Sequence, residues 1–384
     1  MRSYDIIIVG AGAAGLLLAD ALGSDPHFRD KSILLLEKEP NKANDRTWCF
    51  WEKGAGNFEP LLFASWDHLY FGGKQFSGMF PIAPYSYKMI RSGDFYAEYE
   101  NRIAGHANVF VQYRTVTGFR EEAGGVFVET TAEPYRCTHL FNSTLSWDNL
   151  LRNASLPVLQ QHFIGWFVRT QQPVFNKEAP TFMDFSIPQK GNTRFMYLLP
   201  FSDTEALLEY TLFSEDLLME EEYDAALADY MTDVLKCEHY KVVEREKGRI
   251  PMTCHDFAAG NTDHIMNIGM AGGWAKPSTG YTFMNTNRKT KELVAHMKLG
   301  KPLSRFGHRD RYWWYDLLLL DILERDNSRG QKIFEALFSK KKPQLILKFL
   351  DEQTSLLEDF RVIWACPKKD FALAAFRRIL KGGA

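Results

Sequence analysis

A glycine-rich segment between a buried strand and a helix constrains the fold of this chain more than any other feature. Residues 4–9 include the apolar run Ile-Ile-Ile-Val and predict a fully buried strand. The segment GAGAAG at residues 10–15 follows, and residues 16–22 predict an apolar helix. A second buried strand over residues 33–36 ends in Glu37. This order of strand, turn, helix and strand predicts a parallel βαβ unit of the Rossmann type.

The glycines and alanines of this segment each have a predicted role at a bound dinucleotide. Gly10 permits the tight turn from strand to helix, Gly12 lets the backbone approach a pyrophosphate, and Gly15 lets the helix pack closely on the sheet. Ala13 and Ala14 open the helix, whose N-terminus presents free N–H groups and a partial positive charge to phosphates. The alternative, a glycine-rich turn without a ligand, is disfavoured by the strands and the acid around it.

The acid at the end of the second predicted strand indicates where the adenosine half of the dinucleotide binds. Glu37 lies 22 residues after Gly15 and is expected to accept hydroxyl groups of a ribose, with Lys38 beside it as a further contact. The chain has one such unit and no second glycine-rich fingerprint. This favours tightly bound FAD over exchangeable NAD.

The middle of the chain alternates aromatic strands with short loops. Period-two patterning predicts antiparallel strands over residues 182–187, 193–199 and 205–213. Residues 265–281 return to a buried strand and a glycine-rich turn, which predicts a second contact with the same dinucleotide. An ordinary loop before a helix is the alternative. The predicted contacts in this second segment are Gly272, Gly273, Thr279 and Gly280.

These patterns predict an α/β (α+β) chain with three parts. Residues 1–84 and 246–304 are expected to form a discontinuous Rossmann-type FAD-binding domain. Residues 85–245 are expected to form a β-rich substrate-binding domain, and residues 305–384 a helical C-terminal region.

Charge and composition exclude several classes of protein. The chain has 46 basic and 48 acidic residues, so no overall positive charge favours the binding of nucleic acid. The five cysteines form no Cys-x-x-Cys pair and the ten histidines show no metal spacing, so we expect a reducing compartment and no metal. We expect no signal peptide, and no apolar run approaches the ~20 residues that cross a bilayer, so any membrane contact is expected to be peripheral. Aromatic residues make up 14% of the chain and indicate either a pocket for a large apolar or conjugated ligand or an aromatic-rich core.

The C-terminal region carries an excess of basic residues. Between residues 331 and 384 there are 11 Lys or Arg and 6 Asp or Glu. Apolar residues recur beside lysines there, which is typical of a basic amphipathic element at a membrane surface. The alternative is that the apolar positions pack onto the core and the lysines are solvated, and the sequence leaves both open. The residues of this predicted element are Phe334, Leu337, Phe338, Leu345, Ile346, Phe349 and Leu350, with Lys340, Lys341, Lys342 and Lys348.

Short motifs spread over nearly the whole chain carry a family resemblance. The most specific are DRTWCFW at residues 45–51 and KPSTGY at residues 276–281. Together with the glycine-rich segment and the motifs given next, they make the chain resemble the flavin-dependent lycopene cyclases of bacteria and plants. These further motifs are YKMIRSGDF at residues 87–95, QHFIGW at 161–166, MDF at 183–185, LEYT at 208–211 and IPM at 250–252.

This resemblance implies a fold like that of the aromatic hydroxylases, with a dinucleotide domain, an antiparallel sheet over the substrate cavity and a helical C-terminus. It implies that linear lycopene enters from a membrane and that its two ends are cyclised in turn to β-rings, giving β-carotene. It also implies that reduced FAD stabilises a cationic transition state without net redox change. NAD(P)H would then serve only to reduce the flavin.

Two positions depart from the pattern of the family. Its members usually carry a second carboxylate directly after the catalytic glutamate, where this chain has Tyr210. Many FAD enzymes of the same superfamily have Gly-Asp where this chain has Gly269 and Met270, so no acidic ribityl contact is carried over.

The predicted catalytic acid is Glu209. In the strand over residues 205–213 it shares one face with Leu207 and Thr211, so it is an ionisable group among apolar neighbours. A carboxyl group that lines a dry cavity has a raised pKa and can act as a general acid toward a double bond. The alternative from the pattern alone is that this face meets water and Glu209 is a solvated carboxylate.

Other side chains have predicted supporting roles. Asp184 is a candidate second acid, base or hydrogen-bonding support for Glu209, or else a structural carboxylate at a strand end. Arg46 and Arg91 are predicted to contact flavin or phosphate, because an arginine stabilises an anionic reduced flavin, or else to form structural ion pairs. Aromatic side chains in residues 163–166 are candidates for cation–π stabilisation of a carbocation.

Two other functions stay open at this point. A flavin monooxygenase acting on a hydrophobic substrate would consume NAD(P)H and oxygen in step with product, whereas a cyclase would not. A carotenoid- or flavin-binding protein without activity would hold a ligand and show no turnover. We expect the cyclase, bound peripherally to the cytoplasmic face of a membrane.

Overall fold

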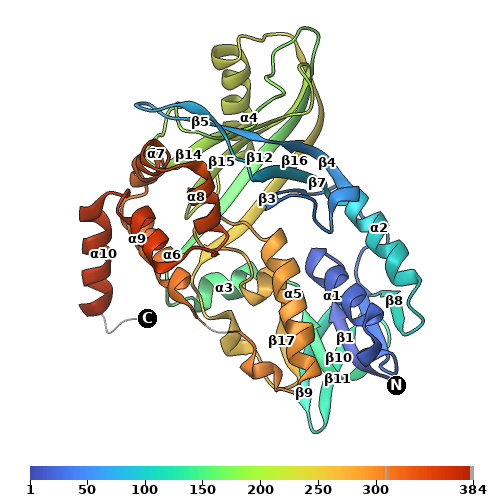
Figure 1. Cartoon of the computed structure of the whole chain (residues 1–384). Helices are drawn as coiled ribbons and strands as arrows, with labels where there is room; N and C mark the ends of the chain where they lie inside the picture. The colour runs from blue at the N-terminus through green and yellow to red at the C-terminus, as the bar shows by residue number, and fades with distance from the viewer. Residues whose placement is uncertain (308, 381–384) are drawn as a thin grey trace.

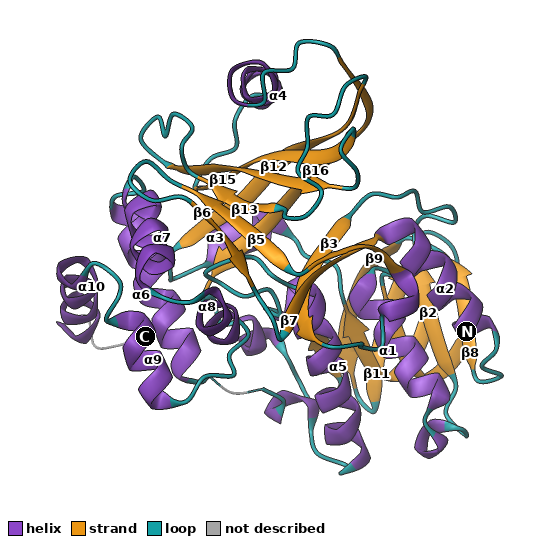
Figure 2. Cartoon of the chain, turned by 45° about the horizontal axis from the view of Figure 1, so that its top comes forward, coloured by secondary structure: helices purple, strands orange, loops and turns teal. Residues whose placement is uncertain are grey.

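The computed structural model describes residues 1–307 and 309–380. In this part of the chain the strands pair into a first, a second and a third sheet. The first sheet lies at the lower right of Figure 1 and the second sheet crosses the upper half. The C-terminal helices lie beside the second sheet, at the left, and Figure 2 shows the same layers from a tilted view.

The first sheet is parallel around the glycine-rich segment, as the βαβ pattern predicts. β1 pairs in parallel with β2 and β11, and β2 pairs in parallel with β8. β10 and β9 extend it as an antiparallel hairpin, and β17 adds to β11. Its strands are β1 (Arg2–Val9), β2 (Ile33–Glu37), β8 (Val109–Tyr113), β9 (Val116–Glu122), β10 (Gly125–Thr130), β11 (Tyr135–Asn142) and β17 (Ile265–Asn267).

β1 is apolar on both faces, and helices cover one of them. Ile6 and Ile8 pack in a core with residues of α1 such as Leu16, whereas Ile7 and Val9 belong to a separate core with β10. The covering helices are α1 (Ala13–Ser24), α2 (Ser92–Ala104) and α5 (Phe283–Lys298), and α1 contacts both of the others.

The second sheet is largely antiparallel, and its order is β16-β12-β15-β14-β13-β5-β6. β13 and β5 are the parallel pair within it. Its strands are β5 (His68–Gly72), β6 (Gly78–Pro81), β12 (Val158–Thr170), β13 (Thr181–Asp184), β14 (Thr193–Pro200), β15 (Glu205–Ser214) and β16 (Tyr240–Thr253).

Alternation along the strands gives the second sheet two buried faces. Leu208 and Tyr210 of β15 pack with Tyr223 of α4 (Glu220–Asp229) on what we call the far face. Leu207 and Phe213 point the other way and join the core that contains the C-terminal helices. We call this second side the cavity face. In Figure 1, α4 lies above the sheet, on the side away from those helices.

The remaining elements are a small third sheet and further helices. The third sheet has the order β3-β7-β4, with β3 (Thr47–Lys53), β4 (Leu62–Trp66) and β7 (Tyr85–Arg91). Among the described helices, none has the length and apolar character needed to cross a membrane. The other helices are α3 (Trp147–Asn153), α6 (Arg311–Arg325), α7 (Arg329–Lys340), α8 (Pro343–Leu350), α9 (Leu356–Ile363) and α10 (Lys368–Leu380).

Strand pairing divides the chain differently from the predicted domain ranges. Residues 109–142, predicted within the β-rich domain, form strands of the first sheet. Residues 68–81, predicted within the FAD-binding part, contain two strands of the second sheet. The chain therefore passes between the sheets more often than the predicted ranges allow, because pairing partners far apart in sequence leave no local signal.

Candidate active site

The glycine-rich segment has the geometry that its sequence predicts. Gly10 has a φ of +90°, and its N–H donates to the Leu36 carbonyl at 2.8 Å. A Cβ on Gly15 would overlap the Gly10 carbonyl oxygen, so the helix packs directly on the turn. A Cβ on Gly12 would meet nothing within 4 Å, so this position is open. The N-terminus of α1, with Ala13, therefore faces free space.

Glu37 closes the end of β2 against the same turn. Its carboxylate accepts hydrogen bonds from the Ala11 N–H at 2.7 Å and the Lys38 N–H at 2.7 Å, and it pairs with Lys42 at 2.8 Å. Burial by itself would raise the pKa of Glu37, but Lys42 and the Ala11 N–H outweigh it and lower the pKa. Glu37 is therefore an ionised acceptor. Lys42 lies outside the predicted strands, and no sequence pattern marked it.

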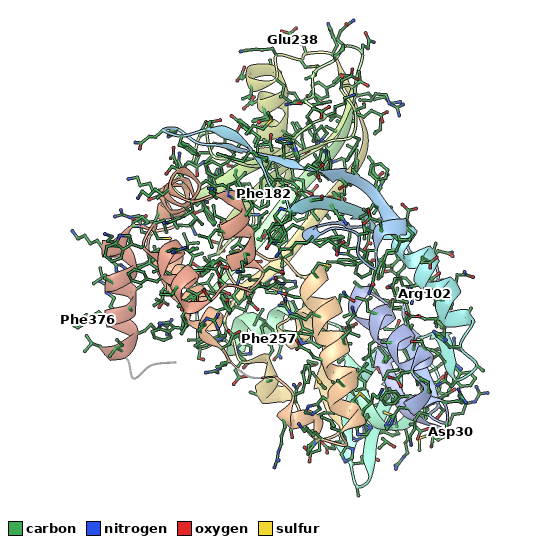
Figure 3. The ribbon with its side chains drawn as sticks, viewed as in Figure 1. Asp30, Arg102, Phe182, Glu238, Phe257 and Phe376 are labelled. Carbon is green, nitrogen blue, oxygen red and sulfur yellow. The ribbon has the colours of Figure 1, made fainter. Side chains whose placement is uncertain are left out.

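A single cavity of about 910 Å³ runs from this turn to the second sheet. At one end it is lined by backbone and polar side chains of the first sheet, and at the other by aromatic and aliphatic side chains. Phe182, labelled in Figure 3, is one of the latter and lies near the middle of the molecule. The predicted site residues that line the cavity are Gly10, Gly12, Ala13, Ala14, Glu37, Lys38, Arg46, Glu209, Thr279 and Gly280.

The second glycine-rich segment faces the cavity in only part of its predicted length. Thr279 and Gly280 line the cavity, and the buried hydroxyl of Thr279 finds no hydrogen-bond partner in the part of the chain that the structure describes. Gly272 and Gly273 do not line it. They close a short helical turn, in which the Gly273 N–H donates to Met270 O at 3.2 Å. The prediction for these two glycines is therefore corrected, because their N–H groups serve the local turn.

The two candidate arginines have different surroundings. Arg46 lines the cavity and is about half exposed. Arg91 does not line it; its guanidinium pairs with Glu244 at 2.5 Å and lies over the rings of Phe63 and Phe167. Arg91 therefore forms a structural ion pair with Glu244, as in the alternative to a flavin contact.

Glu209 points from β15 into the apolar end of the cavity. It is 8% exposed and lies opposite Tyr197 of β14 and Gly165 of β12 in the strand register. Burial raises the pKa of Glu209 well above the ordinary value, and the neighbouring carboxyl of Glu246 raises it further. The raised pKa favours the protonated carboxylic acid, which is the form that a general acid needs.

Glu246 of β16 is a site residue that the sequence analysis missed. It is 7% exposed and lies opposite Gly165, on the other side of β12 from Glu209. Its Oε2 accepts a hydrogen bond from the Thr47 hydroxyl at 2.7 Å. The segment EREKG around it is rich in charge and gives no sign of burial, although the alternation of Glu244, Glu246 and Gly248 is that of one strand face.

A cluster of tyrosines lies beside Glu209 in the cavity. The hydroxyl of Tyr87 is 2.5 Å from that of Tyr197 and 3.1 Å from that of Tyr281. The ring of Trp51 packs edge-on against Tyr281, with centroids 4.7 Å apart. The tyrosine rings present aromatic surface to the cavity while their hydroxyls satisfy one another. Of the predicted aromatic candidates in residues 163–166, Phe163 lines the cavity.

Asp184 and Tyr210 both lie on the far face. Asp184 accepts a hydrogen bond from the Tyr230 hydroxyl at 2.9 Å and from the Ser186 N–H at 2.8 Å, and it does not line the cavity. Its predicted role as a second acid is therefore corrected to that of a structural carboxylate. The Tyr210 hydroxyl accepts from Arg194 at 2.7 Å, so the position after Glu209 points away from the cavity.

Comparison with known proteins places this fold and site in context. The family model described as "Lycopene cyclase protein" matches residues 5–376. A lycopene beta-cyclase of Paracoccus sp. (strain N81106 / MBIC 01143) is 28% identical over 302 residues, covering 73% of this chain and 70% of the relative. One of Pantoea ananas is 24% identical, over 73% and 71% of the two chains. Among solved structures, a flavoprotein/dehydrogenase from Cytophaga hutchinsonii has a similar fold, with a TM-score of 0.63, 11% identity and coverage of 98% of this chain and 100% of the other.

Proposed function

This chain belongs to the lycopene cyclase protein family, and we propose that it cyclises the ψ-ends of lycopene to β-rings, giving β-carotene. One observation carries the proposal: Glu209, buried and favouring its protonated form, opens on an apolar cavity that continues to the glycine-rich segment. Two relatives over most of the chain are lycopene beta-cyclases, which supports the same reaction.

The residues at the polar end of the cavity fit FAD. Gly12 leaves open space at the N-terminus of α1, where backbone N–H groups bind phosphate well. Two buried polar atoms that have no hydrogen-bond partner among the described residues, Gln161 Oε1 and Thr279 Oγ1, belong to residues that line the cavity and are available to a ligand. Reduced FAD would supply a negative charge close to a developing carbocation. We assign NAD(P)H the role of reductant.

In the proposed reaction Glu209 acts as the general acid. It gives its proton to the terminal double bond of the ψ-end, which leaves a tertiary cation on the substrate. The neighbouring double bond attacks this cation and closes a six-membered ring. Loss of one ring proton then leaves the β-ring, so protons and electrons balance and the product is an isomer.

The cavity walls serve this chemistry by excluding water and stabilising positive charge. Apolar side chains of α7 and α8, such as Phe338 and Ile346, line the cavity and keep it dry. Aromatic faces of Tyr197 and Tyr281 lie beside Glu209, and a desolvated cation–π contact contributes about 2 kcal/mol. A dry, aromatic wall protects a carbocation from capture by water.

Pigment analysis tests this function. The full chain is loaded with FAD, given lycopene in liposomes, and either reduced with dithionite or left oxidised before the pigments are separated by chromatography. We expect β-carotene only in the sample whose flavin has been reduced. Consumption of NADPH and oxygen in step with product would instead indicate a monooxygenase, and retention of lycopene without turnover would indicate a carrier.

We also propose that the chain takes its substrate from a membrane surface, although not through the predicted basic amphipathic element. Phe334, Leu337, Phe338 and Ile346 of that element are buried and line the cavity, so its apolar side packs inward. This favours the second of the two alternatives left open by the sequence, because helical periodicity shows an apolar face without showing what covers it.

The exposed apolar residues of the C-terminal region lie instead on α9 and α10. Phe360, Trp364 and Phe376 are 56–60% exposed, and Figure 3 shows Phe376 at the outer edge of the molecule. The exposed cations Arg361 and Lys369 belong to the same part of the chain and complement anionic headgroups. The apolar residues of this face are Leu356, Leu357, Phe360, Trp364, Leu373, Phe376, Ile379 and Leu380.

Liposome flotation tests this surface. Replacing Phe360, Trp364 and Phe376 with Ser is expected to abolish flotation with vesicles that contain anionic lipid, because the buried apolar area drives binding. A matched control reverses the charge of Lys342, which is also exposed but precedes α8 and lies outside α9 and α10. Loss of flotation in the control with retention in the serine variant would contradict the assignment.

A further inference from the structure

Gly165 brings two carboxyl-bearing strands together. β12 lies between β15 and β16, and in the register Gly165 is opposite both Glu209 and Glu246. A Cβ on Gly165 would lie 3.0 Å from Cγ of Glu209 and 3.2 Å from Cγ of Glu246. Both distances are tighter than ordinary van der Waals contact. The two glutamate side chains therefore occupy the space above a residue that has no side chain of its own.

The two carboxyl groups differ in what surrounds them. Glu209 lines the cavity, whereas Glu246 lies behind it and does not. Oε1 of Glu246 is buried and has no hydrogen-bond partner among the described residues, while Oε2 is held by Thr47. A buried carboxylate oxygen without a donor is costly unless a proton lies close to it.

The other groups near the pair do not supply that proton. Cys49 of β3, Tyr197 of β14 and Tyr281 face Glu209 and keep their own protons, because burial raises the pKa of each. Among the described residues, none of them donates a hydrogen bond to Oε1 of Glu246. Near Glu246, Glu244 is engaged by Arg91, and the Arg46 guanidinium donates to the Asp45 carbonyl at 2.7 Å. The hydrogen bonds of these charged groups thus go to other partners, although the positive charge of Arg46 still acts on Glu246, and the carboxyl of Glu209 is its direct neighbour.

We propose that Glu246 is a positioning residue that keeps a proton on Glu209, so that Glu209 meets the hydrocarbon substrate as a neutral acid. This inference rests on the proposed function. It assigns Glu246 a role that acts on the protonation of Glu209 and does not require contact with the substrate. Two carboxyl groups so close in a dry site cannot both be ionised, and one proton is held between them. Burial raises the pKa of both carboxyl groups, and it raises that of Glu209 well above the ordinary value. At Glu246 the Thr47 hydrogen bond and the Arg46 charge oppose the rise, which favours the negative charge of the pair on Glu246 and the proton on Glu209.

Infrared titration of the full FAD-loaded chain tests this inference without substrate. The C=O stretching band of a protonated carboxyl is assigned to Glu209 by its absence in Glu209→Gln, and its loss is followed as the pH rises. In Glu246→Gln the midpoint of this loss is expected to fall by more than about one pH unit. The alkaline limb of the ring-closure rate should move to lower pH by the same amount.

Two further variants separate this role from a structural one. Glu205→Gln changes a carboxyl on the same strand as Glu209, one that is partly exposed and pairs with Arg169, and is expected to leave the midpoint unchanged. Gly165→Ala forces the two side chains apart and is expected to lower the midpoint as Glu246→Gln does. An unchanged midpoint in Glu246→Gln would overturn the inference. Absence of ring closure in the unmodified chain would contradict the proposed function instead, since the infrared midpoint does not depend on turnover.

Discussion

The two faces of the second sheet both bury titratable side chains, but they treat them differently. On the far face each of these groups has a polar partner within the chain. His162 lies 2.7 Å from the Ser214 hydroxyl and also contacts Tyr223, Arg194 donates to Tyr210, and Asp184 accepts from Tyr230. These contacts join α4 and its following turn to the strands, so the far face uses buried polarity to hold elements together.

On the cavity face the tyrosine hydroxyls contact one another, but other polar groups keep free bonding capacity. Within the described part of the chain, Gln161 Oε1, Glu246 Oε1 and Thr279 Oγ1 are buried without hydrogen-bond partners, and no basic side chain pairs with Glu209, whose pKa is raised. Burial alone therefore does not identify a reactive residue in this fold. The distinguishing feature is an unmet hydrogen bond or an unneutralised charge beside a cavity.

The largest expected difference between the faces is in catalysis. Glu209→Gln removes the donated proton and should reduce ring closure by about 10²–10⁴-fold, the usual contribution of a general acid. Retention of FAD should not change, because Glu209 lies at the opposite end of the cavity from the glycine-rich segment. Rates of β-carotene formation and flavin absorbance after gel filtration measure the two properties. Undiminished ring closure by this variant would show that another group is the acid.

A smaller effect, on the pH dependence of the free energy of unfolding, is expected from His162, the buried histidine of the far face. Burial lowers the pKa of His162 to about 4, against 6.5 for an ordinary histidine. As the pH falls below 6.5, His162 becomes protonated in the unfolded chain while it stays neutral in the folded protein. The free energy of unfolding is therefore unaffected by the titration of His162 above pH 6.5 and decreases as the pH falls from 6.5 toward 4. The loss is at most about 3 kcal/mol.

Urea denaturation at several pH values checks this expectation. His162→Gln should flatten the decrease in the free energy of unfolding between neutral and acidic pH. His27→Gln, which changes an exposed histidine, should leave that decrease as it is. Equal slopes for His162→Gln and the unmodified chain would show that His162 titrates normally.

The smallest effect is expected from a change at Asp184, the buried carboxylate on the far face of the second sheet. Asp184→Asn keeps an acceptor for the Ser186 N–H but weakens the bond with Tyr230, and should cost about 1 kcal/mol in the free energy of unfolding. Ring closure should be unchanged. A loss of ring closure comparable to that of Glu209→Gln, with flavin retained, would return Asp184 to the catalytic site.

The parts of the fold and site that could be predicted are those encoded locally. The turn at Gly10, the packing of Gly15 and the position of Glu37 follow from one continuous segment with a strict spacing. The alternation of β15 from Leu207 to Phe213 predicted which residues share a face with Glu209, whereas the family resemblance was needed to favour a cavity over solvent on that face. In each case the signal lies within a few residues of the feature.

The missed features depend on irregularity or on distant partners. Alternation would put Asp184 on the same face as Phe182, but the register of β13 shifts between Thr181 and Asp184, and the carboxylate turns to the far face. Glu246 becomes part of the site only through pairing of β16 with β12. The inward packing of the helices around Phe338 likewise depends on a cavity assembled from remote segments.

The missing side chain at Gly165 also limits how this sequence can evolve. A substitution there would act on two neighbouring strands at once, so the mutational tolerance of this position is set by residues other than its own backbone neighbours. Exchanging either glutamate for a bulkier group would meet the same crowding from the opposite side. The three positions therefore form one evolutionary unit, and variants selected for altered pH range should carry coordinated changes at them.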